Sequence, residues 1–193
     1  VKSMKDKIIL TDCDGVCLDW EAAFQEWMTT NGYVQQEFSV YDISVMYGIE
    51  KEEGKRLVSK FNNSGWMETL PAMRKSRSGI ATLVEAGYKF IAITSLSLDP
   101  RSKVLRVRNL KELYGNAFVD VICLDTGADK DEALEPYRDS GMYWIEDKTE
   151  NAVLGADMGL KSILIDHPHN AECDDERIVR ASTWANVVEE ILG

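Results

Sequence analysis

Two aspartates near the start of the chain, Asp12 and Asp14, have the spacing of a paired carboxylate site. They follow the short apolar run of residues 7–11, and in an extended backbone residues two apart share a face. Gly15 then allows the chain to turn sharply. Two carboxylates held this close repel each other, and Mg²⁺ relieves such repulsion with few carboxylates, waters and phosphate oxygens as its ligands. The pair therefore predicts a magnesium site at which a carboxylate could attack phosphorus.

Other reactive side chains follow later apolar runs. They are Thr94, which ends the run 90–94, Ser95 directly after it, Lys130 beyond the run 119–124, and Glu146 and Asp147 after the run 143–145. Ligands of open α/β sheets bind beyond the carboxyl ends of the strands, so these groups are expected to converge on one edge. Asp147 could then supply further negative charge to a cation that Asp12 and Asp14 begin to bind.

This convergence assigns a chemical role to each group. Asp12 is the expected nucleophile, because a cation and Lys130 offset the charge of the phosphoryl oxygens that it must approach. Asp14 is placed to give a proton to the leaving oxygen and later to take one from water. It would have to be protonated in the resting complex, which favours some burial or a neighbouring anion.

The surrounding pattern predicts an α/β, Rossmann-like doubly wound parallel sheet. Short Ile- and Val-rich runs alternate with amphipathic stretches of helical length, several of which end at glycine. Such runs lack polar alternation because both faces of a parallel sheet are buried. The expected strands are 7–11, 90–94, 119–124, 143–145 and 162–165, and the expected helices are 76–86, 103–114, 130–139 and 149–158.

Residues 20–74 interrupt this alternation and are interpreted as an inserted helical module, the cap segment. Residues 1–19 and 75–193 then form the core. Helical patterns cover 21–30 and 51–61, with no convincing buried strand between them. Its aromatic residues could build a small core of their own or form a stacking wall over a substrate. They are Trp20, Phe24, Trp27, Tyr33, Phe38, Tyr41, Tyr47, Phe61 and Trp66.

Composition excludes several classes of protein. Hydrophobic residues make up 45% and charged residues 28% of the 193 positions, as in ordinary globular chains. The net charge of −11 opposes binding to polymeric nucleic acid, although a small anionic substrate stays open through local cations or a metal. No apolar run has the roughly 20 residues that a membrane span needs. The four cysteines lack a zinc-site spacing and are expected to be reduced thiols in a cytoplasm.

In their order along the chain, these motifs resemble the haloacid dehalogenase superfamily of phosphohydrolases. The matching segments are Asp12-Cys13-Asp14-Gly15-Val16, the apolar run ending in Thr94-Ser95, Lys130 opening a helix, and Glu146-Asp147 after a strand. The resemblance covers the core from residue 7 to about residue 169. An aspartate two positions after the nucleophile is the phosphatase pattern of that superfamily.

The resemblance implies Asp12 as the phosphorylated nucleophile and Asp14 as the general acid and base. Mg²⁺ would be held by Asp12, the main-chain carbonyl of Asp14, and Asp147. Thr94 and Ser95 would bind the phosphoryl group, which Lys130 would neutralise. Glu146 is a metal ligand or a group behind one, and Asn151 orients Asp147 or assists the metal.

The cap segment occupies the position at which members of the superfamily carry the cap that selects substrates. Its small helical pattern, together with Thr94-Ser95, is similar to the 5'(3')-deoxyribonucleotidase branch, whose aromatic side chains cover the base. Phe24, Trp27, Tyr41, Tyr47 and Trp66 are the candidates here. The expected function is that of a magnesium-dependent phosphomonoesterase acting on a small phosphorylated metabolite such as a nucleoside monophosphate.

Three alternatives stay open. A sugar-phosphate phosphatase or a phosphomutase would use the same core residues with a different cap. A signalling receiver domain also combines acids, a hydroxyl and a lysine, but it runs near 120 residues, lacks such an insertion and is phosphorylated after a later strand. A non-catalytic binding protein of the same fold is disfavoured by the intact Asp12, Asp14 and Asp147.

Overall fold

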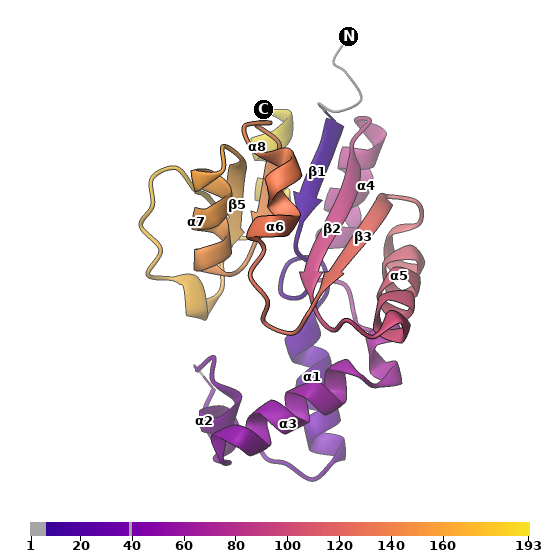
Figure 1. Cartoon of the computed structure of the whole chain (residues 1–193), viewed down its shortest axis with the longest axis vertical. Helices are drawn as coiled ribbons and strands as arrows, with labels where there is room; N and C mark the ends of the chain where they lie inside the picture. The colour runs from indigo at the N-terminus through magenta and orange to yellow at the C-terminus, as the bar shows by residue number, and fades with distance from the viewer. Residues whose placement is uncertain (1–6, 39) are drawn as a thin grey trace.

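A computed structural model describes residues 7–38 and 40–193. Residues 1–6, which the sequence assigns to the core, and Ser39 of the cap segment lie outside the described residues. The described chain forms a six-stranded sheet in the order β3-β2-β1-β4-β5-β6, and every pairing is parallel (Figure 1). The strands are β1 (Ile8–Thr11), β2 (Lys89–Ser95), β3 (Phe118–Leu124), β4 (Tyr143–Glu146), β5 (Lys161–Ile165) and β6 (Val179–Ala181). The prediction of a doubly wound α/β sheet is confirmed.

Helices cover both faces of this sheet. The main core cluster joins β1 and β2 to α4 (Ser76–Glu85), α5 (Pro100–Tyr114) and α8 (Trp184–Leu192) on one face. On the other face, α6 (Asp131–Leu134) packs with residues of β1, β2 and β4, and α7 (Thr149–Asp157) packs on β4 and β5. β1 lies between β2 and β4, so the residues that follow these three strands meet near the middle of one edge.

Two parts of the core differ from the prediction. The helix expected over residues 130–139 is α6 followed by the 3-10 helix η3 (Glu135–Tyr137), because Pro136 lacks the backbone N–H that would continue an α-helix. β6 and α8 extend the sheet and its helical layer beyond the predicted elements. Thr183 caps α8 by accepting a hydrogen bond from the Ala185 backbone, and Trp184, Val187 and Ile191 bury one side of that helix.

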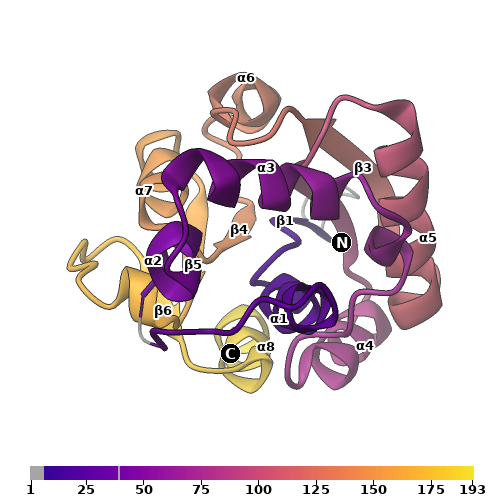
Figure 2. The same ribbon diagram turned by 90° about the horizontal axis from the view of Figure 1, so that it is seen from below.

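The cap segment leaves the sheet directly after the loop that follows β1. It contains α1 (Trp20–Thr30), α2 (Ile43–Tyr47), α3 (Lys51–Asn62) and the 3-10 helix η2 (Gly65–Glu68). An isolated bridge between Leu18 and Ala72 brings its two ends together before α4 begins. These helices lie across the carboxyl ends of the strands, as the view from below shows (Figure 2).

Most of the aromatic side chains of the cap segment build its own core. Trp20 stacks on Phe24, with ring centroids 4.7 Å apart, and meets Phe61 edge-on at 5.5 Å. Phe24 also packs against Trp27 and Tyr47. This packing fixes α1 against α3 and so fixes the surface that the cap segment turns toward the sheet.

None of the helices in the described residues is long and apolar enough to cross a membrane.

Candidate active site

A buried cluster of three charged side chains lies where β1 and β4 end. The Nζ atom of Lys130 is 3.0 Å from Asp12 Oδ1, donates a hydrogen bond to Glu146 Oε1 at 2.7 Å, and donates another to the Ile93 carbonyl at 3.1 Å. An ammonium group has three N–H donors, so these contacts use all of them. Lys130 therefore acts beside Asp12 through its charge and holds that carboxylate in place.

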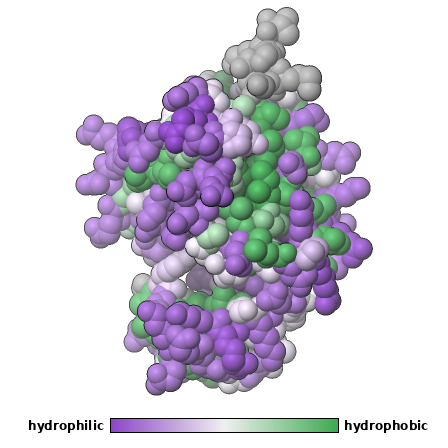
Figure 3. All heavy atoms as spheres, in the orientation of Figure 1, coloured by the Kyte–Doolittle hydropathy of each residue, from purple (hydrophilic) through white to green (hydrophobic). Residues whose placement is uncertain are grey.

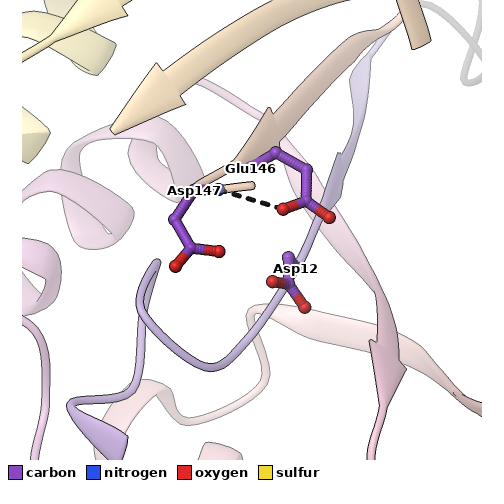
Figure 4. A group of neighbouring side chains, drawn as sticks. All are labelled: Asp12, Glu146 and Asp147. Atoms are coloured by element: carbon purple, nitrogen blue, oxygen red, sulfur yellow. Dashed lines mark hydrogen bonds between the residues drawn. The ribbon is translucent and has the colours of Figure 1, made fainter. Parts of the chain in front are cut away.

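Asp147 completes a group of three carboxylates with Asp12 and Glu146, whose oxygens lie within 4.8 Å of one another (Figure 4). Together with Lys130 they carry a net charge of about −2 when all are ionised, which one divalent cation would balance. Carboxylate oxygens also suit a hard cation such as Mg²⁺. The donor set therefore fits the magnesium that the sequence predicts.

Glu146 stands behind this site and does not face it. Its Oε1 accepts from Lys130, and its Oε2 accepts from the backbone N–H groups of Asp147 and Lys148 at 3.0 and 3.1 Å. The side chain is fully buried and is not among the residues that line the cavity. Of the two roles that the sequence left open for Glu146, the geometry favours the supporting one, and Asp12 and Asp147 remain the side chains available to a metal.

Burial and neighbouring charge make Asp12 hold its proton more tightly than an ordinary aspartate. Burial and repulsion from Glu146 raise the pKa of Asp12 to about 7, although Lys130 opposes the rise. Burial also raises the pKa of Asp147, and a hydrogen bond from His169 opposes it. Ionising both carboxylates without a cation therefore costs free energy, and a bound cation would offset that cost.

Asp14 lies on the loop that follows β1, and its side chain pairs with Arg106 of α5. Its Oδ1 and Oδ2 accept hydrogen bonds from Arg106 of α5 at 2.6 and 2.9 Å. The Arg106 side chain is fully buried, whereas the Asp14 side chain is 26% exposed and lines the cavity. The sequence led us to expect some burial of Asp14 or a neighbouring anion; the structure shows a partly buried Asp14 whose neighbour is a cation. Both oxygens of Asp14 therefore accept hydrogen bonds from the Arg106 guanidinium.

The loop between β1 and the cap segment has a tight conformation that depends on a glycine at position 15. The Cys13 carbonyl accepts hydrogen bonds from the backbone of Val16, Cys17 and Leu18, which folds the loop tightly around it. Gly15 has a φ of 79°, and a Cβ atom built on it would lie 2.3 Å from Asp147 Oδ2. A side chain at position 15 would therefore displace the Asp147 carboxylate.

The hydroxyl residues after β2 separate into two environments. Ser95 lines the cavity and donates to the Ala128 carbonyl at 3.0 Å. Thr94 is 1% exposed and is not among the lining residues, so a direct contact with a phosphoryl group is supported for Ser95 alone. Asn151 also lines the cavity, but the described hydrogen bonds do not join its side chain to Asp147.

The loop after β5 positions Asp147 and the loop after β1. His169 Nε2 is 3.2 Å from Asp147 Oδ2, and buried Asn170 donates to the Asp147 carbonyl at 2.7 Å. His167 Nε2 is 2.6 Å from the Gly15 carbonyl. Burial tends to lower the pKa of His169, but Asp147 outweighs burial and raises it. Tyr41 of the cap segment packs on the His169 ring at 4.6 Å, so this loop also contacts the cap segment.

A cavity of about 430 Å³ connects these groups to the cap segment. Figure 3 shows the hollow between the helices of the cap segment and the sheet. Its floor includes Asp12, Asp14, Lys130 and Asp147, and its other wall is largely apolar. Of the five aromatic residues proposed from the sequence to cover a base, only Tyr41 is in the lining, which also contains Trp20 and Phe38.

Comparisons with known proteins agree with this architecture. No family model matches the chain. A 32.4 kDa protein of the Gp30-rIII intergenic region of Enterobacteria phage T4, described as uncharacterized, is 27% identical over 134 residues, which are 66% of this chain and 48% of that protein. The chain therefore spans about half the length of this curated relative.

Solved structures cover nearly the whole chain. A predicted phosphatase from Clostridium acetobutylicum is 13% identical, with 96% of this chain and 98% of that chain covered and a TM-score of 0.64. An L-2-haloacid dehalogenase is 12% identical, with 96% and 99% covered and a TM-score of 0.61. The chain has the haloacid dehalogenase-like fold. A third structure with this fold, a D,D-heptose 1,7-bisphosphate phosphatase from B. bronchiseptica complexed with magnesium and phosphate, is 15% identical, with 96% and 98% covered and a TM-score of 0.57.

A proton and a cation compete for the Asp12 carboxylate, so cation binding at this site should depend on pH. In the folded protein without metal, Asp12 keeps its proton up to about pH 7, whereas its ordinary pKa is 3.8. The folded state then binds more protons than the unfolded state between these values, so the free energy of unfolding falls as pH rises through them. A cation bound at Asp12 would have to displace that proton below pH 7, so its affinity should drop about tenfold for each unit by which the pH falls.

We therefore expect millimolar Mg²⁺ to raise the melting temperature more at pH 8 than at pH 6. The stabilisation should differ by about 1 kcal/mol. Thermal unfolding with and without MgCl₂ at both pH values measures this difference, and Asp12→Asn should remove it. Equal shifts at the two pH values would show that Asp12 does not exchange a proton for the metal.

Proposed function

We propose that the protein is a magnesium-dependent phosphomonoesterase that acts through an aspartyl-phosphate at Asp12 on a small phosphorylated metabolite, with a nucleoside monophosphate as the favoured class. The observation that carries the proposal is the placement of Asp12. This buried carboxylate lies at the floor of a cavity, 3.0 Å from Lys130 and beside Asp147. A nucleophile in this position can approach a phosphoryl group whose leaving group occupies the cavity above it.

Asp12, Asp147 and the main-chain carbonyl of Asp14 are the groups that would hold Mg²⁺. When bound, the cation would offset the charge of the phosphoryl oxygens and so let a carboxylate approach them. The magnesium and phosphate in the complex of the B. bronchiseptica phosphatase support this assignment for a related fold. Glu146 and His169 would set the orientation of Lys130 and Asp147 from behind.

The proposed reaction has two steps. In the first, an Asp12 oxygen forms a bond to phosphorus, the bond from phosphorus to the leaving oxygen breaks, and Asp14 gives that oxygen a proton. In the second, Asp14 takes a proton from a water molecule that attacks the phosphorus, and the bond to Asp12 breaks to release phosphate. Ser95 would turn its hydroxyl from the Ala128 carbonyl to donate to a phosphoryl oxygen, and Lys130 would offset the phosphoryl charge without a direct hydrogen bond. Asp14 must exchange a hydrogen bond to Arg106 for a proton before the first step.

Phosphate release from a panel of nucleoside monophosphates and sugar phosphates, with Mg²⁺ or with a chelator, tests the proposed function. We expect release that requires Mg²⁺ and favours nucleoside monophosphates. A ranking led by sugar phosphates would assign the chain to the sugar-phosphate alternative. Absence of release from every member of the panel by folded, magnesium-loaded protein would contradict a phosphomonoesterase and favour a binding role.

A further inference from the structure

The cap segment gives the cavity a wall without basic side chains. Its described lining residues include Ile43, Met46 and Val58, and none of those in the segment is Lys or Arg. Its charged contribution, Glu21, is an acid. A second phosphate or a carboxylate on the leaving group would meet no cation from the cap segment, whereas an uncharged group would fit against apolar walls. The phosphoryl group would remain at the opposite end, beside Asp12 and Lys130.

One polar side chain in this wall is buried and only partly satisfied. Asn62, the last residue of α3, is 7% exposed and lines the cavity. Its Oδ1 accepts a hydrogen bond from Trp20 Nε1 at 2.7 Å. No described residue accepts a hydrogen bond from its Nδ2. Among the described residues, the fully buried side-chain atoms that lack a hydrogen-bond partner are Arg106 Nε and Asn109 Oδ1, and Asn62 Nδ2 is not one of them. Nδ2 therefore keeps some accessible surface, and because Asn62 lines the cavity we take the cavity as the side from which this atom is reached.

Trp20 determines which end of the Asn62 amide faces the ligand. An indole N–H can only donate, so the amide oxygen must face Trp20 and the amide nitrogen is left for the cavity. Trp20 is itself held by stacking on Phe24 and by an edge contact with Phe61. Trp20 belongs to α1 and Asn62 to α3, so this hydrogen bond joins the two helices of the cap segment. The structure thus holds a hydrogen-bond donor in a fixed orientation.

We propose that Asn62 is a specificity-determining residue that donates from Nδ2 to an acceptor on an uncharged leaving group. A carbonyl oxygen or ring nitrogen of a nucleobase has this chemistry. The proposal rests on the proposed phosphomonoesterase function and adds the residue that selects the leaving group. A site built to donate to an acceptor disfavours substrates that lack one, because its buried N–H then stays unpaired.

The test compares kcat/KM for the best nucleoside monophosphate and for ribose 5-phosphate, which lacks the base. In Asn62→Leu the ratio of the two values should fall about 10- to 100-fold, the effect of leaving a buried polar contact unmade. Trp20→Phe keeps an aromatic ring but removes the N–H that orients the amide, and it should lower the ratio by a smaller factor. Asn63→Leu is the matched control, since Asn63 is exposed, does not line the cavity and should leave the ratio as in the wild type.

Each result has a distinct meaning. A fall in the ratio for Asn62→Leu but not for Asn63→Leu supports the assignment. Equal losses on both substrates in Asn62→Leu would show a structural role and overturn it, as would an unchanged ratio or a wild-type enzyme that hydrolyses ribose 5-phosphate but no nucleotide. A wild-type protein that hydrolyses neither substrate would instead contradict the proposed function itself, and the assignment would fall with it.

Discussion

Replacing Lys130 by methionine is expected to abolish phosphate release and to lower the free energy of unfolding by about 3 kcal/mol at pH 8. The Lys130 side chain is 2% exposed and lies against the carboxylates of Asp12 and Glu146. Methionine keeps the length and the apolar stem of the side chain, so the loss reports the missing charge. The two carboxylates would then repel each other in a buried site without a counter-charge.

Acid should relieve this repulsion. The pKa of Asp12, about 7, already includes a lowering by Lys130, so removal of Lys130 would raise that pKa further. The folded variant would then take up an additional proton, and its deficit relative to the wild type should shrink as pH falls from 8 to 5. Denaturant unfolding at the two pH values measures this change.

A second replacement tests the same explanation at neutral pH. In Lys130→Met with Glu146→Gln, one of the two repelling charges is gone, so part of the lost stability should return while phosphate release does not. A deficit below about 1 kcal/mol in the single variant, or one that does not change with pH, would mean that Lys130 does not compensate these buried carboxylates.

Asp14→Ala is expected to lower the free energy of unfolding by about 3 kcal/mol and phosphate release by about 10²- to 10⁴-fold. The loss of stability arises because Arg106 is fully buried and would keep its charge without a partner. The stability figure is at the lower end for a broken buried pair, since the position of Asp14 is partly exposed and water can enter there. The loss of activity arises because alanine cannot transfer a proton.

Two further variants separate these effects. Asp14→Asn keeps one acceptor for Arg106, so it should lose less stability than Asp14→Ala but as much activity. Asp14→Ala with Arg106→Met removes the unpaired charge and should recover stability without recovering activity. If Asp14→Asn retains near wild-type turnover, Asp14 does not act as the general acid and base.

The sequence predicted the residues of the site best where a side chain directly follows a strand. Asp12 and Asp147 are fixed by the ends of β1 and β4, which are neighbours in the sheet, so strand order alone brings them together. Lys130 reaches them from the start of α6. Thr94 shows the limit of this reasoning, because consecutive residues at a strand end face opposite ways and only Ser95 lines the cavity.

Contacts between distant parts of the chain could not be predicted in the same way. Arg106 lies in the middle of an amphipathic helix, 92 positions from Asp14, and no local pattern marks a buried arginine as the partner of a particular acid. The roles of His169 and Asn170 depend on how the loop after β5 folds back on Asp147. By contrast, α8 carried a readable signal, since a threonine cap precedes apolar residues at helical spacing.

Trapping a phosphoryl group on Asp12 is the most direct test of the proposed aspartyl-phosphate. The protein would be mixed with its best phosphomonoester substrate and Mg²⁺, quenched in acid within the first turnover, digested, and examined by peptide mass spectrometry. We expect a phosphoryl group on the peptide that contains Asp12. Asp12→Asn should give no such adduct, and its phosphate release should fall by about four orders of magnitude or more. Phosphate release that survives in Asp12→Asn, or a phosphoryl group found on a different residue, would contradict the proposed aspartyl-phosphate.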